Sequence, residues 1–468
     1  MSVYLRSLLL VAVSVAVACG DEDATDGGNR PTGGSGEGGA GHAQGGGAPG
    51  GSGGGGPTFS EPVVVDLPAL PAGGAVDFTI PSGALGFHLV ARGESVGLWG
   101  IERVSGPEGG AVFDNFAPAG SLVGTGYGYL GVATTAVPLN DQPTTNPPMA
   151  GSWSANLVGN IFSATVSVQR TDDGLFHGGV LDLRIHIADG LVIQDPDPAH
   201  AITAAEAPTD ASVAARVDAF YRALDEHFGI GRGEVTFYAI GAEYLNVVGE
   251  SAFGELIEST AGTPGGQALH MVWSQYIEPQ AGVPVWGVSP GLPGNVLETG
   301  TPASAIALAV QDTFDANADA LTLLHETGHF LGLNHTTELN GIQADPVADT
   351  PECADIGPTA FLQCPDRTNI MFPVYYAATG GIGITVSPTQ VEVVRGAPVY
   401  RAFANAEVAT PRQGSSRMRA VTPPRNSDRI PLSGVVGPRG ISHGLTSCAH
   451  SIPGWSRINR GRGRRPPE

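Results

Sequence analysis

Three histidines in one short segment carry the strongest chemical signal in the sequence. His325 and His329 lie four positions apart, and His335 follows soon after them. In a helix, residues four positions apart lie on one face, so the first two imidazoles are placed to bind one metal ion. With His335 as a third ligand, one coordination position stays open, which is typical of a catalytic rather than a structural zinc site.

The residues between these histidines favour hydrolysis by a metal-activated water. Glu326 directly follows the first histidine, so it lies beside the ligand face and within reach of the proton of a zinc-bound water. Gly332 allows a sharp turn at the end of the helix, because glycine readily adopts a positive φ. That turn would bring His335 back to the metal. The sequence therefore predicts a zinc site with Glu326 as the catalytic general base.

The full motif, His-Glu-x-x-His-x-x-Gly-x-x-His, resembles that of the metzincin zinc peptidases. That clan also places a methionine in a tight turn beneath the zinc, and Met371, in the stretch NIMFP (369–373), fits this position. The stretch DTPEC (349–353), followed by Cys364, is similar to the pappalysin branch. The resemblance covers roughly residues 201–403 and implies a zinc endopeptidase that acts on proteins or peptides.

Two pairs of residues near the motif are interpreted with this resemblance in mind. Cys353 and Cys364 are close together in a chain that we expect to be exported, so we predict a disulfide between them. Position 373 is proline, whereas several metzincins have there a tyrosine that helps to hold the oxyanion. Tyr375 and Tyr376 are therefore interpreted as a wall of the substrate pocket.

An acidic loop between the third histidine and the methionine is a candidate calcium site. Calcium prefers oxygen ligands, and related enzymes often bind it near this place. A solvated acidic loop is the alternative, because the order of the acidic residues is not that of an EF-hand. The four candidate ligands are Asp345, Asp349, Glu352 and Asp355.

The N-terminus is typical of an export signal. Arg6 precedes an apolar run, 8–18, that is too short for a transmembrane helix. The run ends in Ala-Val-Ala before Cys19, which resembles the lipobox of bacterial lipoproteins. The resemblance implies a lipid anchor on Cys19, and Gly20 after it favours the outer membrane or the cell surface. An ordinary secretory signal with Ala-x-Ala cleavage is the alternative.

Residues 59–200 are predicted to form a β-rich sandwich. Apolar and polar residues alternate within 162–169 and 181–187, and this period of two is typical of strands with one buried face. On this pattern His186 lies on the solvent face. The sequence leaves open whether this region is a propeptide, a spacer or a binding domain.

The pattern changes after this region, and residues 201–403 are predicted to form the peptidase domain. Asp210 is a candidate N-cap for a helix that runs to about His227, and Gly229 suits its end. Strands are predicted at 235–240, 268–277 and 305–310. This alternation indicates an α/β (α+β) domain with a mixed sheet and an active-site helix.

The flanking segments complete a multidomain organisation. A signal peptide is predicted at 1–19 and a Gly-rich flexible linker at 20–58. The Arg- and Pro-rich tail, 404–468, is predicted to be disordered. A charged docking tail and a misread reading frame are both open explanations of this tail.

Charge and composition limit the partners. The formal net charge is −22, and the acidic residues lie mostly within 60–400, so nucleic acid is disfavoured because its phosphates would be repelled. Nothing in the sequence defines an oligomeric state. The competing function is a surface-anchored binding or adhesive lipoprotein with a non-catalytic zinc site. The presence of Glu326 favours the enzyme.

Overall fold

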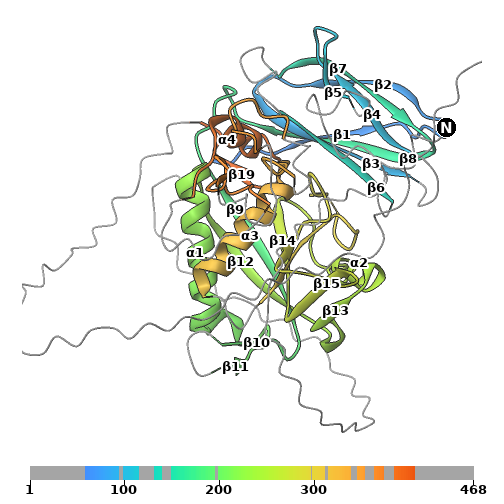
Figure 1. Cartoon of the computed structure of the whole chain (residues 1–468). Coiled ribbons are helices and arrows are strands. Elements are labelled where there is room, and N and C mark those ends of the chain that lie inside the picture. Colours follow the sequence, from blue (N-terminus) through green and yellow to red (C-terminus); the bar gives the residue numbers. More distant parts are fainter. Residues whose placement is uncertain are drawn as a thin grey trace, which may run out of the picture. The chain divides into compact units, whose positions relative to one another are not determined.

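A computed structural model of the chain (Figure 1) describes much of the sequence between residues 58 and 405. The described residues are 58–93, 99–114, 131–139, 149–194, 199–296, 298–310, 315–338, 345–353, 363–373 and 384–405. The predicted signal peptide, the tail from 406 and nearly all of the linker lie outside them, as do Cys19, Asp355, Tyr375 and Tyr376. The chain divides into two units after Pro411, and the second unit lies wholly outside the described residues.

Two four-stranded antiparallel sheets form in residues 58–172, here called the antiparallel region. Their facing side chains share one hydrophobic core, in which the Phe87 and Trp153 rings meet edge to face at 5.0 Å. The first sheet has the order β1 (Val63–Leu67), β8 (Ile161–Arg170), β3 (Ala84–Gly93) and β6 (Val132–Val137). The second has the order β2 (Gly74–Ile80), β7 (Gly151–Val158), β4 (Gly100–Ser105) and β5 (Ala111–Asp114).

A mixed six-stranded sheet organises residues 179–405, here called the parallel-sheet region. Four parallel strands stand in the order β12 (Ile230–Ile240), β9 (Gly179–Ala188), β14 (Ala268–Ser274) and β18 (Ile306–Ala309). The antiparallel strands β17 (Gly287–Val288) and β19 (Arg401–Ala402) pair with β18 and β9. The predicted α/β class and mixed sheet are therefore confirmed.

Helices cover both faces of this sheet. One core joins it to α1 (Ala211–Phe228), α3 (Ala316–Phe330) and α4 (Pro388–Arg395), and another joins it to α2 (Glu250–Glu258). The remaining elements are short: η2 (Ala207–Thr209), η3 (Ala242–Tyr244), the ribbon β10 (Val192–Ile193) and β11 (His200–Ala201), and a small sheet of β13 (Asn246–Val248), β15 (Tyr276–Gln280) and β16 (Val283–Val285). Within the described ranges, no helix is long and apolar enough to span a membrane.

The prediction that the strand at 181–187 belongs to the N-terminal sandwich was wrong. This strand is β9, which pairs in parallel with β12 and β14, so the expected boundary at residue 200 falls after a strand of the second sheet. His186 is also not in solvent. It is 1% exposed, its Nε2 lies 3.1 Å from Nδ1 of His270, and its ring stacks on Tyr238. Alternation shows that the two faces differ, but it does not show whether the polar face is covered.

Helix α1 agrees with the prediction. Asp210 accepts hydrogen bonds from the Ser212 and Val213 amides, at 2.8 and 3.0 Å, and Gly229 ends the helix at φ 72°. The strands predicted at 235–240 and 305–310 overlap β12 and β18, whereas the strand predicted at 268–277 is divided into β14 and β15.

Candidate metal centre

Helix α3 carries the first two histidines because its ends are well defined. Asp315 is the N-cap, and its carboxylate accepts hydrogen bonds from the Asn317 and Ala318 amides. After Phe330 the chain turns at Gly332, whose φ is 112°, a conformation that L-residues with a side chain rarely adopt. The glycine of the motif therefore does what its position predicts, since it redirects the chain from the helix toward His335.

The three predicted ligands converge on one point. One nitrogen from each of His325, His329 and His335 can be chosen so that all three lie within 4.8 Å of one another. The Nε2 atoms of His329 and His335 are 3.1 Å apart. Zinc–nitrogen bonds of about 2.0–2.1 Å require ligand nitrogens at roughly this separation. The donor set and its size therefore fit zinc.

Each imidazole is oriented through its other nitrogen. Nδ1 of His325 lies 2.5 Å from the Ile370 carbonyl, and Nδ1 of His329 lies 2.7 Å from the Leu333 carbonyl. Nδ1 of His335 lies 3.2 Å from a Glu338 carboxylate oxygen. A ring that donates through Nδ1 presents the Nε2 lone pair to a metal.

Burial keeps the rings of His325 and His329 neutral, which is the form that binds metal. Burial, together with the neighbouring His335 ring, lowers the pKa of His325 to about 3. The pKa of His329 is lowered well below its usual value, mainly by burial and then by the other two rings. Deprotonated imidazoles thus face one another in a site that needs a cation to bring them together.

Glu326 lies beside the histidines with one oxygen unsatisfied. The side chain is 1% exposed, the Ser289 backbone amide donates to it, and among the described residues its Oε2 has no hydrogen-bond partner. Burial raises the pKa of this carboxyl group to about 8. A metal ion nearby would favour the ionised form. An unpartnered carboxylate oxygen in a buried site is costly unless a cation or a bound water meets it.

Strand β17 passes directly over Glu326, a feature that the sequence analysis missed. A Cβ added to Gly287 would lie 2.6 Å from Cγ and 2.9 Å from Oε1 of Glu326. The position therefore accepts only glycine if the carboxylate keeps its place. Sequence alone held no signal for this contact, because β17 and α3 are separated by a long connection.

The methionine turn lies beneath the histidines, as the resemblance implies. Met371 is fully buried, and the Phe372 amide donates to the Asn369 carbonyl at 3.0 Å, closing a tight turn. A Cβ added to Gly328 would lie 2.5 Å from the Met371 sulfur. Glycine between the ligand histidines thus lets the sulfur approach the helix closely.

A reciprocal amide pair holds this turn. Asn369 and Gln390 exchange side-chain hydrogen bonds of 2.9 and 3.1 Å. Gln390 belongs to the capping box of α4 with Ser387. The turn is thereby tied to the N-terminus of α4, and through the Ile370 carbonyl it orients His325.

The predicted disulfide between Cys353 and Cys364 is confirmed, with Cα atoms 5.2 Å apart. Both half-cystines pack with Phe372 in a small core of their own. The Cys353 amide also donates to Thr337 Oγ1 at 3.0 Å. Through its packing on Phe372, the disulfide therefore joins the acidic loop to the residue that directly follows Met371.

The acidic residues proposed for calcium are only partly brought together. Asp349 Oδ2 accepts a hydrogen bond from the Thr389 amide, Glu352 is exposed, and Asp355 lies outside the described residues. Asp345 is buried, and burial raises its pKa to about 7. The charge of Asp366 makes a smaller contribution in the same direction.

Asp366, which the sequence analysis did not single out, lies with Asp345. Its Oδ2 accepts hydrogen bonds of 2.6 and 3.1 Å from the Thr336 and Thr337 hydroxyls, and Thr350 donates to Asp345 Oδ1 at 2.6 Å. The second oxygen of each carboxylate is buried without a partner among the described residues. Asp345 and Asp366, rather than the exposed part of the loop, therefore carry the buried carboxylate oxygens of this segment.

Replacing Gly287 by Ala tests the contact between β17 and Glu326. The added Cβ must displace Glu326, and a displacement on the scale of 1 Å can cost up to about 10²-fold in rate. We expect kcat/KM for peptide hydrolysis to fall at least tenfold with zinc still bound. Gly254→Ala in α2 is the control, because a Cβ there meets nothing within 4 Å. Equal activity of the two variants would refute the contact.

Comparison with known proteins finds the same resemblance. The profile of the family described as pregnancy-associated plasma protein-A, peptidase family M43, matches residues 300–367. A search of curated proteins found no match.

Two solved structures that match are also metal peptidases by name. Archaemetzincin from Methanopyrus kandleri is 16% identical over 47% of this chain and 88% of its own, with a TM-score of 0.24. Metalloproteinase-II from Bacteroides fragilis is 12% identical over 39% of this chain, with a TM-score of 0.22. The matched part spans about half (51%) of that protein. Such low TM-scores do not establish a common fold. The resemblance of this chain to the pappalysin-like branch of the metzincin zinc peptidases therefore rests on the segment that bears the three histidines.

Proposed function

We propose that this protein is a zinc-dependent endopeptidase. The observation that carries the proposal is the convergence of three imidazoles beside a buried carboxylate with an unpartnered oxygen. His325, His329 and His335 would hold zinc. Zinc, when bound, supplies a Lewis acid that polarises the scissile carbonyl and acidifies a water.

Glu326 is the base in this proposal. Its Oε2 accepts the proton of the attacking water and later delivers it to the leaving amine. The Ser289 amide holds the carboxylate in place, and the close Gly287 backbone restricts its rotation. Burial of the carboxylate keeps bulk water from competing for this proton.

The alternative, a binding lipoprotein with a non-catalytic zinc site, is less well supported. Structural zinc sites are usually closed by four protein ligands. In the part of the chain that the structure describes, the cluster supplies three histidines and no fourth ligand. A carboxylate poised beside the open position suits proton transfer and adds nothing to a purely structural role.

The layout of the chain is also part of the proposal. We interpret the two antiparallel sheets around Trp153 as a β-sandwich that precedes the peptidase domain. The peptidase domain then begins at β9 rather than at residue 201, since β9 is an inner strand of its sheet.

Replacing Glu326 by Gln should lower the rate of casein hydrolysis by about 10² or more, the usual scale for a positioned acid–base group. Zinc content, measured by metal analysis, should stay at that of the unmodified protein, because the three ligands are untouched. Glu258→Gln, an exposed position on α2, is the matched control. Near-normal turnover in the first variant would exclude Glu326 as the base, and cleavage of end-blocked peptides would identify an endopeptidase.

We also propose a calcium site between Asp345 and Asp366. A ligand that binds only the folded state at about 100 times Kd adds about 2.7 kcal/mol of stability. Calcium should therefore raise the melting temperature by several degrees in scanning fluorimetry. The double variant Asp345→Asn, Asp366→Asn should lose this shift, whereas Asp225→Asn on the exposed face of α1 should keep it. An unchanged melting temperature on adding calcium to the wild-type protein would rule the site out.

Export as a lipoprotein stays a proposal, with Cys19 as the lipidated residue and the outer membrane or cell surface as its location. Cys19→Ser should move the protein from the membrane fraction to the soluble fraction, because a lipid anchor needs the thiol. Cys448→Ser should leave the distribution unchanged. A wild-type protein that fractionates as soluble would favour the secretory alternative.

A further inference from the structure

The first antiparallel sheet has a second face, which the alternation along β8 assigns to solvent, yet a central patch of this face is buried. Its side chains come from β3, β6 and β8 and point away from the Trp153 core. Each of them is at most 5% exposed: His88, Val90, Thr134, Ala136, Ser167 and Gln169. A largely polar patch that is so well shielded from solvent must be covered by another part of the same unit.

The contacts identify the cover as the parallel-sheet region. Thr134 Oγ1 donates to the Pro293 carbonyl at 2.6 Å, and Gln169 Nε2 donates to the Tyr400 carbonyl at 2.8 Å. At the rim, Arg92 pairs with Glu298 at 3.0 Å.

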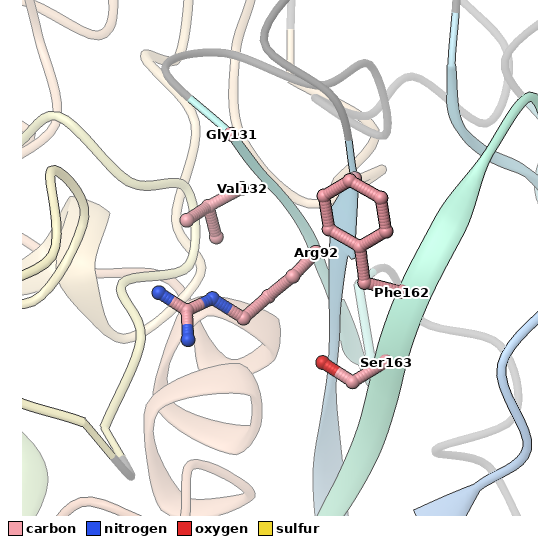
Figure 2. A pocket seen from close by; sticks show the side chains of 6 residues that line it. Arg92, Gly131, Val132, Phe162 and Ser163 are labelled. Atoms are coloured by element: carbon pink, nitrogen blue, oxygen red, sulfur yellow. The ribbon is translucent and has the colours of Figure 1, made fainter.

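Figure 2 shows the Arg92 side chain extended beside a pocket of about 270 Å³. Phe162 and Ser163 line this pocket from β8. The pocket marks where the covered face ends, since Phe162 is 55% exposed.

The C-terminal end of the parallel-sheet region is tied to the N-terminal end of the antiparallel region as well. The Ser60 amide donates to the Ala402 carbonyl, and the Ala404 amide donates to the Thr58 carbonyl, both at 2.9 Å. The rings of Phe59 and Phe403 stack at 5.4 Å. The two regions therefore share backbone hydrogen bonds as well as side-chain contacts.

The centre of this interface lies against the turn that follows α3. A Cβ added to Gly332 would lie 2.9 Å from Cβ of Ala136 on β6, so the turn backbone packs directly on this alanine. His88 on β3 is buried against the Leu331 backbone, and neither of its ring nitrogens meets a hydrogen-bond partner of good geometry. Both residues thus press on the segment between the second and third zinc ligands.

We infer that Ala136 and His88 are positioning residues, through which the antiparallel region sets the turn that brings His335 to the metal. The inference rests on the proposed zinc site. The turn also supplies the Leu333 carbonyl that orients His329, so a shift of this turn moves two of the three ligands together. Metal affinity is sensitive to such changes behind the ligands, typically by 10–100-fold.

This arrangement also assigns a role to residues 58–172. A propeptide must leave without dismantling the enzyme that it guards. Here removal of the region would expose the turn and leave the Pro293 and Tyr400 carbonyls without their side-chain donors. The inference therefore favours a retained region over a removable propeptide for residues 58–172.

The test uses two matched substitutions on opposite faces of β6 in the full-length protein. Ala136→Leu adds bulk against the turn, whereas Ala133→Leu adds the same bulk in the Trp153 core, since Ala133 belongs to that core. Overpacking should lower the melting temperature of both variants. Zinc affinity is measured by competition with a chromophoric chelator, and ligand geometry by the visible absorption of the cobalt-substituted protein.

We expect Ala136→Leu to bind zinc at least tenfold more weakly and to change the cobalt spectrum, with Ala133→Leu like the wild type in both. Ala136→Val replaces Ala136→Leu if the larger side chain prevents folding. Equal zinc affinity and equal spectra in the folded Ala136 variant and the wild type would overturn the inference but leave the zinc site standing. A wild-type protein that binds no zinc would overturn the proposed function as well.

Discussion

Helix α3 carries His325, Glu326 and His329, so the rest of the candidate site depends on where this helix lies. Its first half is joined to α1 by the ion pair of Arg216 with Asp319, whose Nε and Oδ2 are 2.6 Å apart and whose side chains are 1% and 0% exposed. Removing one partner of such a pair typically costs about 3–5 kcal/mol, because the other charge stays buried without compensation. The directional hydrogen bond favours one register of α3 on α1, and hence one height for the histidines above the sheet.

Once α3 is placed, the imidazoles are oriented by segments that come from elsewhere in the chain. The Ile370 carbonyl belongs to the methionine turn, and Glu338 follows the third ligand. The disulfide and the Asn369–Gln390 pair hold the first of these segments. The groups that orient the three histidines therefore depend on tertiary structure, whereas the spacing of His325 and His329 depends on the helix alone.

The chemistry of the site could be predicted from the sequence because most of it is local. Four of its residues lie within one helix and the turn after it, and Met371 and the cysteine pair are recognisable by their order along the chain. The caps of α1 were also predictable, since Asp210 and Gly229 act on their own helix. Apart from Met371 and the cysteines, each of these signals is a matter of spacing within a few turns of chain.

What the sequence could not show depends on contacts between distant segments. The alternation in β9 was visible, but its parallel neighbours and the cover over His186 were not. Asp366 is an ordinary acidic residue until the fold buries it near Asp345. In each case the hydrophobic pattern defines a strand or a loop and says nothing about its partner.

Close backbone contacts at glycine residues show how strongly one segment can fix the position of the segment packed against it. Gly86 and Gly396 meet so closely that a Cβ on Gly86 would lie 2.6 Å from the Gly396 backbone. This contact joins β3 to the end of α4, on the same interface as Ala136 and the turn at Gly332. Backbone packed against backbone leaves little freedom to slide, because protein interiors respond to the addition of even one methylene. The small residues along this seam therefore fix the antiparallel sheet against the turn that leads to His335, although none of them has a reactive group.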